Sequence, residues 1–411
     1  GQARFPTVHA TSLLAVLQKF AAVPRRLGDL GDDVVITMHW NETTAQTDGT
    51  IRRETRCVDG PEDLVLSGPH FFVGNPLSKT PRARCVTSAD YDGFDLEAMP
   101  ETYWPRTNYV PACDAAEYRR RLPRWPGTDR VMTDGYWVAL RAMLAQNGER
   151  TLIPALMPPG LASVHTCQAI HARSETLLLD LLALMSSLPC DYRIRSTGAG
   201  GAYQSLLTRL PLLEPTGARR AALHVRALLL NCLTTAYAPL WAEVFDPAFT
   251  RETWLASDPR LPASTFTALG STWSWETPVR SALARRQLLV ELDVLVAREL
   301  KLTLDELQTV YRLQFPVLRQ YEHDTWYDAR GRIVFTANKG LPGVGLTRSE
   351  WNGVRHLPPG EVVTRTVTDD TQPGGPRQRV IEYVAPFDRR DRVADYATAW
   401  AMLDAREGSP T

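Results

Sequence analysis

Residues 67–111 read SGPHFFVGNPLSKTPRARCVTSADYDGFDLEAMPETYWPRTNYVP, and this stretch limits the kinds of fold that the chain can adopt. It mixes aromatic residues, arginines, prolines and small polar residues without the period of about 2 or 3.6 that marks a strand or a helix. Because it has no amphipathic face, we expect the rest of the fold to hold it in place. Irregular segments on a rigid scaffold are where binding residues concentrate. Planar cations, amides and ring faces suit a partner with phosphates and base edges.

The overall composition is that of a globular protein with no net charge. Its 411 residues predict two or three domains. The 46 basic and 46 acidic residues cancel, so binding to nucleic acid would have to depend on a local patch. Arginine dominates the basic residues, and its planar fork can hold phosphate or guanine with two hydrogen bonds. A GC-rich genome would explain the same bias. The only lysines are Lys19, Lys79, Lys301 and Lys339.

Cysteine usage and hydropathy indicate a cytoplasmic protein with no membrane partner. None of the six cysteines are spaced as C-x-x-C, and we expect reduced, mostly buried thiols. The most apolar segment, residues 177–185, contains Asp180 and is too short to cross a bilayer. We also expect no signal peptide.

Patterns along the chain predict a mixed α+β fold. Ser174 is a typical N-cap before an apolar helical pattern, and Thr303 with Glu306 predicts a capping box. The expected helices cover residues 7–20, 174–188, several segments of 216–320, and 394–405, and the expected strands cover 34–38, 331–336 and 379–384, with a Pro/Gly hairpin near 372–376.

These elements suggest three parts. Residues 1–215 would form a strand-rich lobe, in which two sub-lobes divide near residue 149. Residues 216–320 would form a helical spacer, and residues 321–411 a small α/β piece that ends in a helix.

No complete catalytic motif is found. Methyl transfer to an amino group of a base needs a polar-Pro-Pro-aromatic loop, and neither 75–77 nor 157–160 has the full pattern. The glycine-rich segments 197–201 and 343–345 are weak versions of a cofactor loop. His165 and His171 flank Cys167 but lack a second ligand pair for zinc. We therefore predict no catalytic, cofactor-binding or metal-binding residue within this chain.

Binding signals are stronger than catalytic ones, because arginines and aromatic residues interleave between positions 103 and 137. A solvated basic helix over an aromatic core would give the same pattern, and each polar candidate could instead make a structural hydrogen bond. The candidates for DNA-backbone contacts are Arg106, Arg119, Arg120, Arg121, Arg124, Arg193 and Arg195, the last two beside the 197–201 loop. The candidates for reading base edges are Asn41, Gln46, Arg52, Arg53, Asn108 and Tyr109.

Several short motifs follow one another in an order that matches a known family. They are Asn41-Glu42-Thr43 through Asp48-Gly49-Thr50, Ser67-Gly68-Pro69-His70, Gly74-Asn75-Pro76, Pro105-Arg106-Thr107-Asn108-Tyr109, Glu149-Arg150-Thr151-Leu152-Ile153, Pro158-Pro159-Gly160 and Gln314-Phe315-Pro316-Val317. In this order the chain resembles the C-terminal target-recognition half of the large class I N6-adenine DNA methyltransferases. These include type IIG (Eco57I-like) restriction-modification enzymes and the methylases of the phage-defence systems BREX (PglX-like) and DISARM.

The resemblance implies a mixed α/β recognition lobe followed by helical spacers. In that family the catalytic loop and the S-adenosylmethionine motifs lie upstream of this half, so S-adenosylmethionine is expected in the full-length enzyme and not in this chain. The chain would be a truncated protein or a split subunit that binds double-stranded DNA. Its partners would be a methyltransferase catalytic domain or subunit, other defence-system proteins, or phage inhibitors. The alternative is a protein-interaction scaffold of a phage-defence complex, whose basic cleft binds a partner or inhibitor protein.

Overall fold

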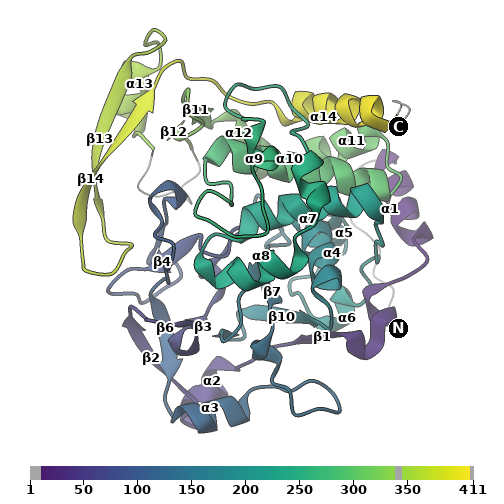
Figure 1. Ribbon diagram of the computed structural model, residues 1–411, viewed down its shortest axis with the longest axis vertical. Helices are drawn as coiled ribbons and strands as arrows, with labels where there is room; N and C mark the ends of the chain where they lie inside the picture. Colours follow the sequence, from purple (N-terminus) through teal and green to yellow (C-terminus); the bar gives the residue numbers. More distant parts are fainter. Residues whose placement is uncertain (1–10, 338–344, 408–411) are drawn as a thin grey trace.

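A four-stranded antiparallel sheet lies at the centre of the molecule. The computed structural model describes residues 11–337 and 345–407, which form a mixed α+β fold (Figure 1). The candidate helix residues 7–10 and cofactor-loop residues 343 and 344 lie outside the described residues. Along the sheet the order is β1 (Val34–Thr37), β10 (Cys167–Ala172), β7 (Trp137–Arg141) and β8 (Pro154–Met157).

Both faces of this sheet are buried, which explains its nearly continuous apolar strands. Val138 and Leu140 pack into the large apolar core on the helical side. Their neighbours Trp137 and Ala139 pack into a second core on the opposite side. Successive side chains of a strand point to opposite faces, so one strand supplies two cores. The sheet therefore separates a helical layer from a layer built largely of irregular chain.

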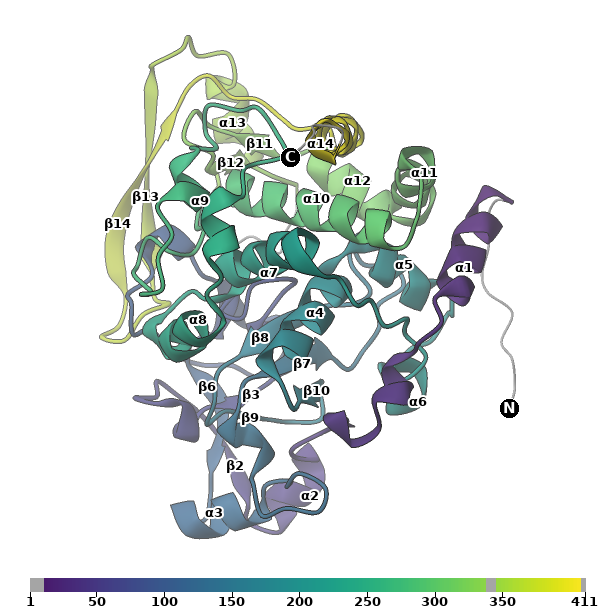
Figure 2. The same cartoon turned by 45° about the vertical axis from the view of Figure 1, so that its right-hand side comes forward.

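Helices cover one face of the sheet (Figure 2), where α4 (Glu175–Ser186) contacts the strands and both α7 (Gly217–Asn231) and α10 (Ala282–Glu299) pack on α4 and on each other. Ser174 caps the innermost helix by accepting a hydrogen bond from Leu177 N, as predicted, and the Thr303–Glu306 capping box is also confirmed. Around these three central helices lie α1 (Ser12–Ala22), α5 (Leu188–Arg195), α11 (Leu304–Gln314), α12 (Pro316–His323) and α14 (Arg392–Glu407).

The irregular stretch 67–111 covers the other face, and buried or half-buried arginines hold its backbone. Arg141 Nε donates to Gly68 O at 2.8 Å, Arg285 Nη2 to Gly74 O at 2.7 Å, and Arg280 Nη1 to Leu96 O at 3.2 Å. All three donors lie outside the stretch, so the expectation that the rest of the fold holds it is confirmed. Its short strands are β4 (Lys79–Pro81) and β5 (Tyr91–Gly93), and β3 (Val65–Leu66) precedes it, paired with β9 (Ala162–Ser163).

A small lobe (residues 40–56 and 107–131) projects from one end of the molecule, at the bottom of Figures 1 and 2. It has its own apolar cluster, in which Trp40 Nε1 donates to the Tyr118 hydroxyl at 2.8 Å. Its elements are α2 (Glu42–Thr47), β2 (Ile51–Arg56), β6 (Thr107–Pro111) and α3 (Ala115–Arg121), with β2 and β6 paired antiparallel.

The C-terminal part contributes a long two-stranded hairpin beside the irregular stretch, at the left of Figure 1. The predicted hairpin near residues 372–376 is confirmed, and Arg379 Nη1 ties the ribbon to Asp95 Oδ2 at 2.5 Å. Its elements are β11 (Trp326–Tyr327), β12 (Ile333–Phe335), α13 (Arg348–Val354), β13 (Val362–Asp369) and β14 (Arg377–Val384).

One apolar core extends across the two borders expected from the sequence. It contains residues from α1, the central sheet, α4, α7, α10 and α14, so the 215/216 and 320/321 positions do not separate independent cores. None of the described helices is both long and apolar enough to cross a bilayer. The remaining helices are α6 (Gln204–Leu207), α8 (Ala238–Val244) and α9 (Ser264–Thr267).

Candidate functional site

The small lobe carries most of the residues predicted to contact DNA. Ten of the thirteen candidates belong to it, and seven of those ten are exposed. Two of the thirteen, Arg121 and Arg193, are half-buried, and Arg193 lies on α5 in the helical layer. The exposed seven are Asn41, Gln46, Arg52, Arg53, Arg119, Arg120 and Arg124.

Arg106 and Arg195 do not fit the predicted contact with a DNA backbone. The Arg106 guanidinium is buried and binds Asp370, with Nη2 at 2.9 Å from Oδ1. Arg195 is also buried, donates to Thr151 Oγ1 and Gly148 O at 2.8 Å each, and lies over the ring of Phe315. Each guanidinium is thus occupied within the protein, so we correct both assignments to structural contacts.

Asn108 and Tyr109 are corrected in the same way. The Asn108 amide donates to Tyr91 Oη at 2.9 Å and to Cys85 Sγ at 3.0 Å, and its oxygen accepts from Thr55 Oγ1. The Tyr109 hydroxyl donates to Glu42 Oε1 at 2.5 Å. Both side chains lie on β6 and are at most 7% exposed, so neither can reach a base edge.

Two of the three arginines at the end of α3, Arg119 and Arg120, are exposed, and all three are paired with a carboxylate. Arg119 forms two hydrogen bonds with Asp134, of 2.6 and 2.8 Å, and Arg120 forms two with Glu117, of 2.7 and 2.8 Å. Hydrogen bonds from Arg120 and Arg121 lower the pKa of Glu117 to about 2. Exposed ion pairs of this kind contribute little to stability, so a phosphate can replace the carboxylate. Tyr118 is buried beneath this helix. The helix therefore also matches the alternative interpretation of the sequence, a solvated basic helix over an aromatic core.

A second concentration of charged side chains, several of them buried, lines a cavity of about 570 Å³ that we call the arginine cavity. It lies where the irregular stretch, the edge of the central sheet, α10, α12 and the C-terminal hairpin meet. Its basic lining residues are Lys79, Arg141, Arg150, Arg280, Arg285, Arg286, Arg332 and Arg392, and its acidic ones are Asp95, Glu97, Glu149 and Glu322.

Four of these eight cations have carboxylate partners and four do not. Arg150, Arg286, Arg332 and Arg392 form ion pairs. By contrast, Arg141, Arg280 and Arg285 donate only to backbone carbonyls. The Lys79 ammonium has no hydrogen bond or ion pair within the described residues. The cavity is therefore electropositive.

Burial shifts the pKa values of the cavity groups, and the values of Arg141 and Arg285 remain above neutral pH. Burial lowers the pKa of Arg141 to about 10 and that of Arg285 to about 9. It also lowers the pKa of Lys79, with Arg141 adding to the effect. Burial raises the pKa of Glu149 to about 7, although Arg150 opposes the shift. A carboxyl that titrates near neutrality inside a cavity is a recognised sign of a functional site.

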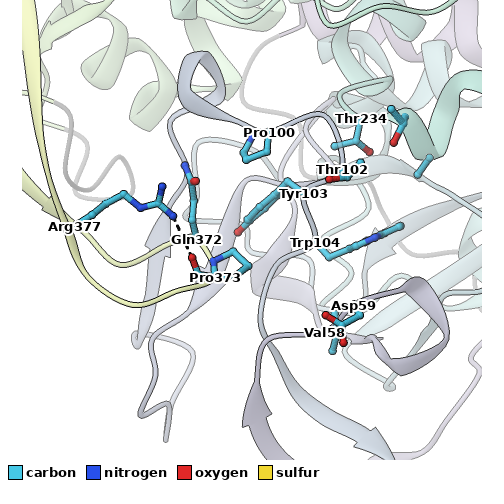
Figure 3. Close-up of a pocket in the computed structure, with 12 residues that line it drawn as sticks. Val58, Asp59, Pro100, Thr102, Tyr103, Trp104, Thr234, Gln372, Pro373 and Arg377 are labelled. Atoms are coloured by element: carbon cyan, nitrogen blue, oxygen red, sulfur yellow. Dashed lines mark hydrogen bonds between the residues drawn. The ribbon is translucent and has the colours of Figure 1, made fainter.

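A second hollow, of about 670 Å³, lies where the irregular stretch, the segment after α7 and the C-terminal hairpin meet (Figure 3). Pro100 and Trp104 from the stretch line it, together with Thr234, which follows α7, and Arg377 of the hairpin. Arg377 Nη2 donates to Pro373 O at 3.1 Å. Its charged lining residues, Asp59 and Arg377, have opposite signs, so this hollow has no excess charge with which to attract an ion.

The histidine and cysteine candidates do not assemble into a metal site. His171 is buried with its Nε2 at 3.2 Å from His39 Nε2, whereas His165 is exposed. No group of three or more His, Cys, Asp or Glu side chains within residues 11–337 and 345–407 could hold a metal ion. All six cysteines are free thiols.

Sequence reasoning missed the arginine cavity because its charged groups come from positions as distant as Lys79 and Arg392. The one available signal was that residues 67–111 must be held by other parts of the chain.

No family model matches this sequence, and a search of curated proteins finds no match.

Proposed function

We propose that this chain is the DNA sequence-recognition region of an adenine-specific (N6) DNA methyltransferase of a restriction-modification or phage-defence system. It binds duplex DNA, while methyl transfer from S-adenosylmethionine is carried out by a domain or subunit outside this chain. One observation carries the proposal: seven residues with phosphate-binding or base-reading side chains are exposed together on the small lobe. The family resemblance supports the same role.

The contacts divide between two kinds of side chain. Arg119, Arg120 and Arg124 would hold phosphates, exchanging carboxylate or carbonyl partners for phosphate oxygens. The polar side chains on α2 and β2 would read base edges. Gln46 on α2 and Arg52 on β2 are exposed, and the groups that accept their hydrogen bonds lie within the same lobe.

Salt dependence of duplex binding tests the proposal. Replacing Arg119, Arg120 and Arg124 together by Gln should weaken binding to every sequence and reduce the slope of log K against log salt by roughly 2 to 3. The matched control replaces Arg251, Arg330 and Arg355 by Gln, which removes the same charge from exposed positions on other elements. Equal affinity and slope for the two triple variants would overturn the DNA assignment, and would favour the alternative of a protein-interaction scaffold.

A further inference from the structure

The arginine cavity presents hydrogen-bond donors that have no acceptors. Arg286 Nη2 and Tyr383 Oη are buried and make no hydrogen bond with any described residue, and both residues line this cavity. The Lys79 ammonium, also in the lining, has no partner among the described residues. These three donors come from α10, β14 and β4, so the tertiary structure alone brings them to one cavity.

Such donors are unusual in a protein interior. More than about 90% of buried polar groups have a hydrogen-bond partner, and each exception calls for an explanation. Arg286 already binds Glu322 at 2.9 Å and Asp395 at 2.6 Å, so the missing partner is not a missing countercharge. The missing partner of Arg286 Nη2 is an acceptor, the Lys79 ammonium is a donor, and the Tyr383 hydroxyl can donate as well. A ligand rich in acceptor oxygens would bind the Lys79 ammonium directly and would reach the two buried atoms after a small shift of the lining side chains.

The charges of the cavity specify an anion. Arg141 lies with its guanidinium carbon 5.5 Å from the Phe72 ring centre and donates to Gly68 O and Phe71 O. It has no carboxylate partner, and neither do Arg280, Arg285 and Lys79. An anionic ligand would supply a direct ion pair to buried and half-buried cations that form none within the described residues.

The rest of the lining is apolar and partly aromatic. Phe72, Phe94, Leu96, Ile153 and Leu318 line the same cavity as the cations. The volume of about 570 Å³ lies within the range of roughly 300–1,000 Å³ that small-molecule sites have. A fitting ligand therefore combines an anionic group with a flat or apolar one.

We propose that the arginine cavity binds one nucleotide, with its phosphate among the cationic donors and its base against the apolar lining beside Phe72 and Phe94. Two sources share this chemistry: a free nucleoside monophosphate, and a nucleotide turned out of a DNA strand. Only the second source rests on the proposed function. Base stacking on aromatic rings and phosphate binding by arginine need no particular sequence, so any base is a ligand of this class.

Binding of adenosine 5′-monophosphate, measured by calorimetry on the full chain, tests the site. Lys79→Met and Tyr383→Phe should each weaken binding about tenfold, the effect of losing one hydrogen bond to a charged group. Lys301→Met and Tyr203→Phe remove the same groups from exposed positions and should leave binding unchanged. Adenosine without phosphate should bind far more weakly than the monophosphate.

Two results would overturn the site: no binding of the monophosphate by the wild-type chain, or equal binding by wild type, Lys79→Met and Tyr383→Phe. Thermal melting establishes that each variant is folded. Tyr383→Phe removes a hydroxyl that has no partner among the described residues, so it should not destabilise the protein and remains decisive if Lys79→Met unfolds.

Competition identifies the source of the nucleotide and separates this proposal from the proposed function. A duplex with one unpaired adenine that displaces the monophosphate, where a fully paired duplex does not, identifies an extruded nucleotide. Monophosphate binding that neither duplex affects identifies a free nucleotide. Duplex binding without monophosphate binding overturns only the cavity, and the reverse result overturns only DNA recognition.

Discussion

Arginines of the helical layer and arginines of the small lobe have the same side chain and opposite roles. Arg226 and Arg285 are buried, and every hydrogen bond they make is to another part of the same chain. Arg119 and Arg120 are exposed and pair with carboxylates close in sequence. Removing water strengthens the first set of contacts, whereas water and salt compete with the second.

This difference shows that arginine content alone does not locate a binding surface. A buried guanidinium with carbonyl partners stabilises irregular backbone, as Arg285 does at Gly74. An exposed guanidinium with a carboxylate partner can exchange that partner for a ligand. Accessibility and partner type, which depend on the tertiary structure, separate structural arginines from candidate binding residues.

Among the buried arginines of the helical layer, we expect the largest effect on stability from Arg226→Met. Arg226 binds Glu291 at 2.7 Å and Glu252 at 2.8 Å and is fully buried. Its loss leaves Glu291 buried without a countercharge, which should destabilise the protein by about 3–5 kcal/mol in urea unfolding. Arg251→Met, at an exposed position on the same side of the fold, should change stability by less than about 0.5 kcal/mol. Similar values for the two variants would remove the distinction between the sets.

The pH dependence of protein stability tests how strongly burial disfavours the charged form of Glu149, a carboxyl in the arginine cavity. Burial raises the pKa of Glu149 from 4.5 to about 7. The pKa of Glu149 is higher in the folded protein than in the unfolded chain. Its contribution to the free energy of unfolding is therefore fully present below about pH 4.5 and is lost as pH rises through 7. The wild type should therefore lose up to about 3 kcal/mol relative to Glu149→Gln between pH 4.5 and pH 8. Parallel stability curves over this range would contradict the shift.

Arg285→Met should have a smaller effect than Arg226→Met. Arg285 donates to Val279 O, Gly74 O and Leu230 O, and burial already lowers its pKa to about 9. Losing it removes an unfavourable buried charge as well as three hydrogen bonds, so we expect about 1–3 kcal/mol. Amide hydrogen exchange should accelerate within residues 67–111 and much less in α4. Uniform acceleration would show that Arg285 does not specifically hold the stretch.

The smallest effect should come from Glu117→Gln in the small lobe. This change frees Arg120 and Arg121 from their shared carboxylate and should raise affinity for duplex DNA by a factor of about two to five. Asp305→Asn, which removes an acidic charge from the first turn of α11, is the control. Fluorescence anisotropy at two salt concentrations measures both. Weaker DNA binding by Glu117→Gln would place the relevant arginines elsewhere.

Local features of the fold could be predicted from the sequence because their causes are local. Ser174 lies three residues before Leu177, whose amide it caps, and Thr303 and Glu306 satisfy each other across one turn. The hairpin near residues 372–376 follows from glycines whose φ angles are positive, at Gly374 and Gly375. Such signals need only a few neighbouring residues.

The candidate site could be predicted only in part. The exposed arginines of α3 were identified because they are consecutive, and the same pattern could not tell that Arg106 and Arg195 are buried. Arg106 reaches Asp370, 264 residues away in the chain, and Arg195 reaches Gln314, 119 residues away. A single sequence carries no signal for contacts over such separations.

The sequence by itself determined the mixed α+β character, several helix caps and the need for residues 67–111 to be held from outside. The tertiary structure decided which residues hold them. Arg285 bonds to Gly74 across 211 residues, and Lys79, Arg286 and Tyr383 meet at one cavity. The physical reason is that propensity and capping act between neighbours along the chain, whereas burial and charge pairing depend on where distant segments pack. For an arginine, that packing decides between holding backbone and offering a site to a ligand.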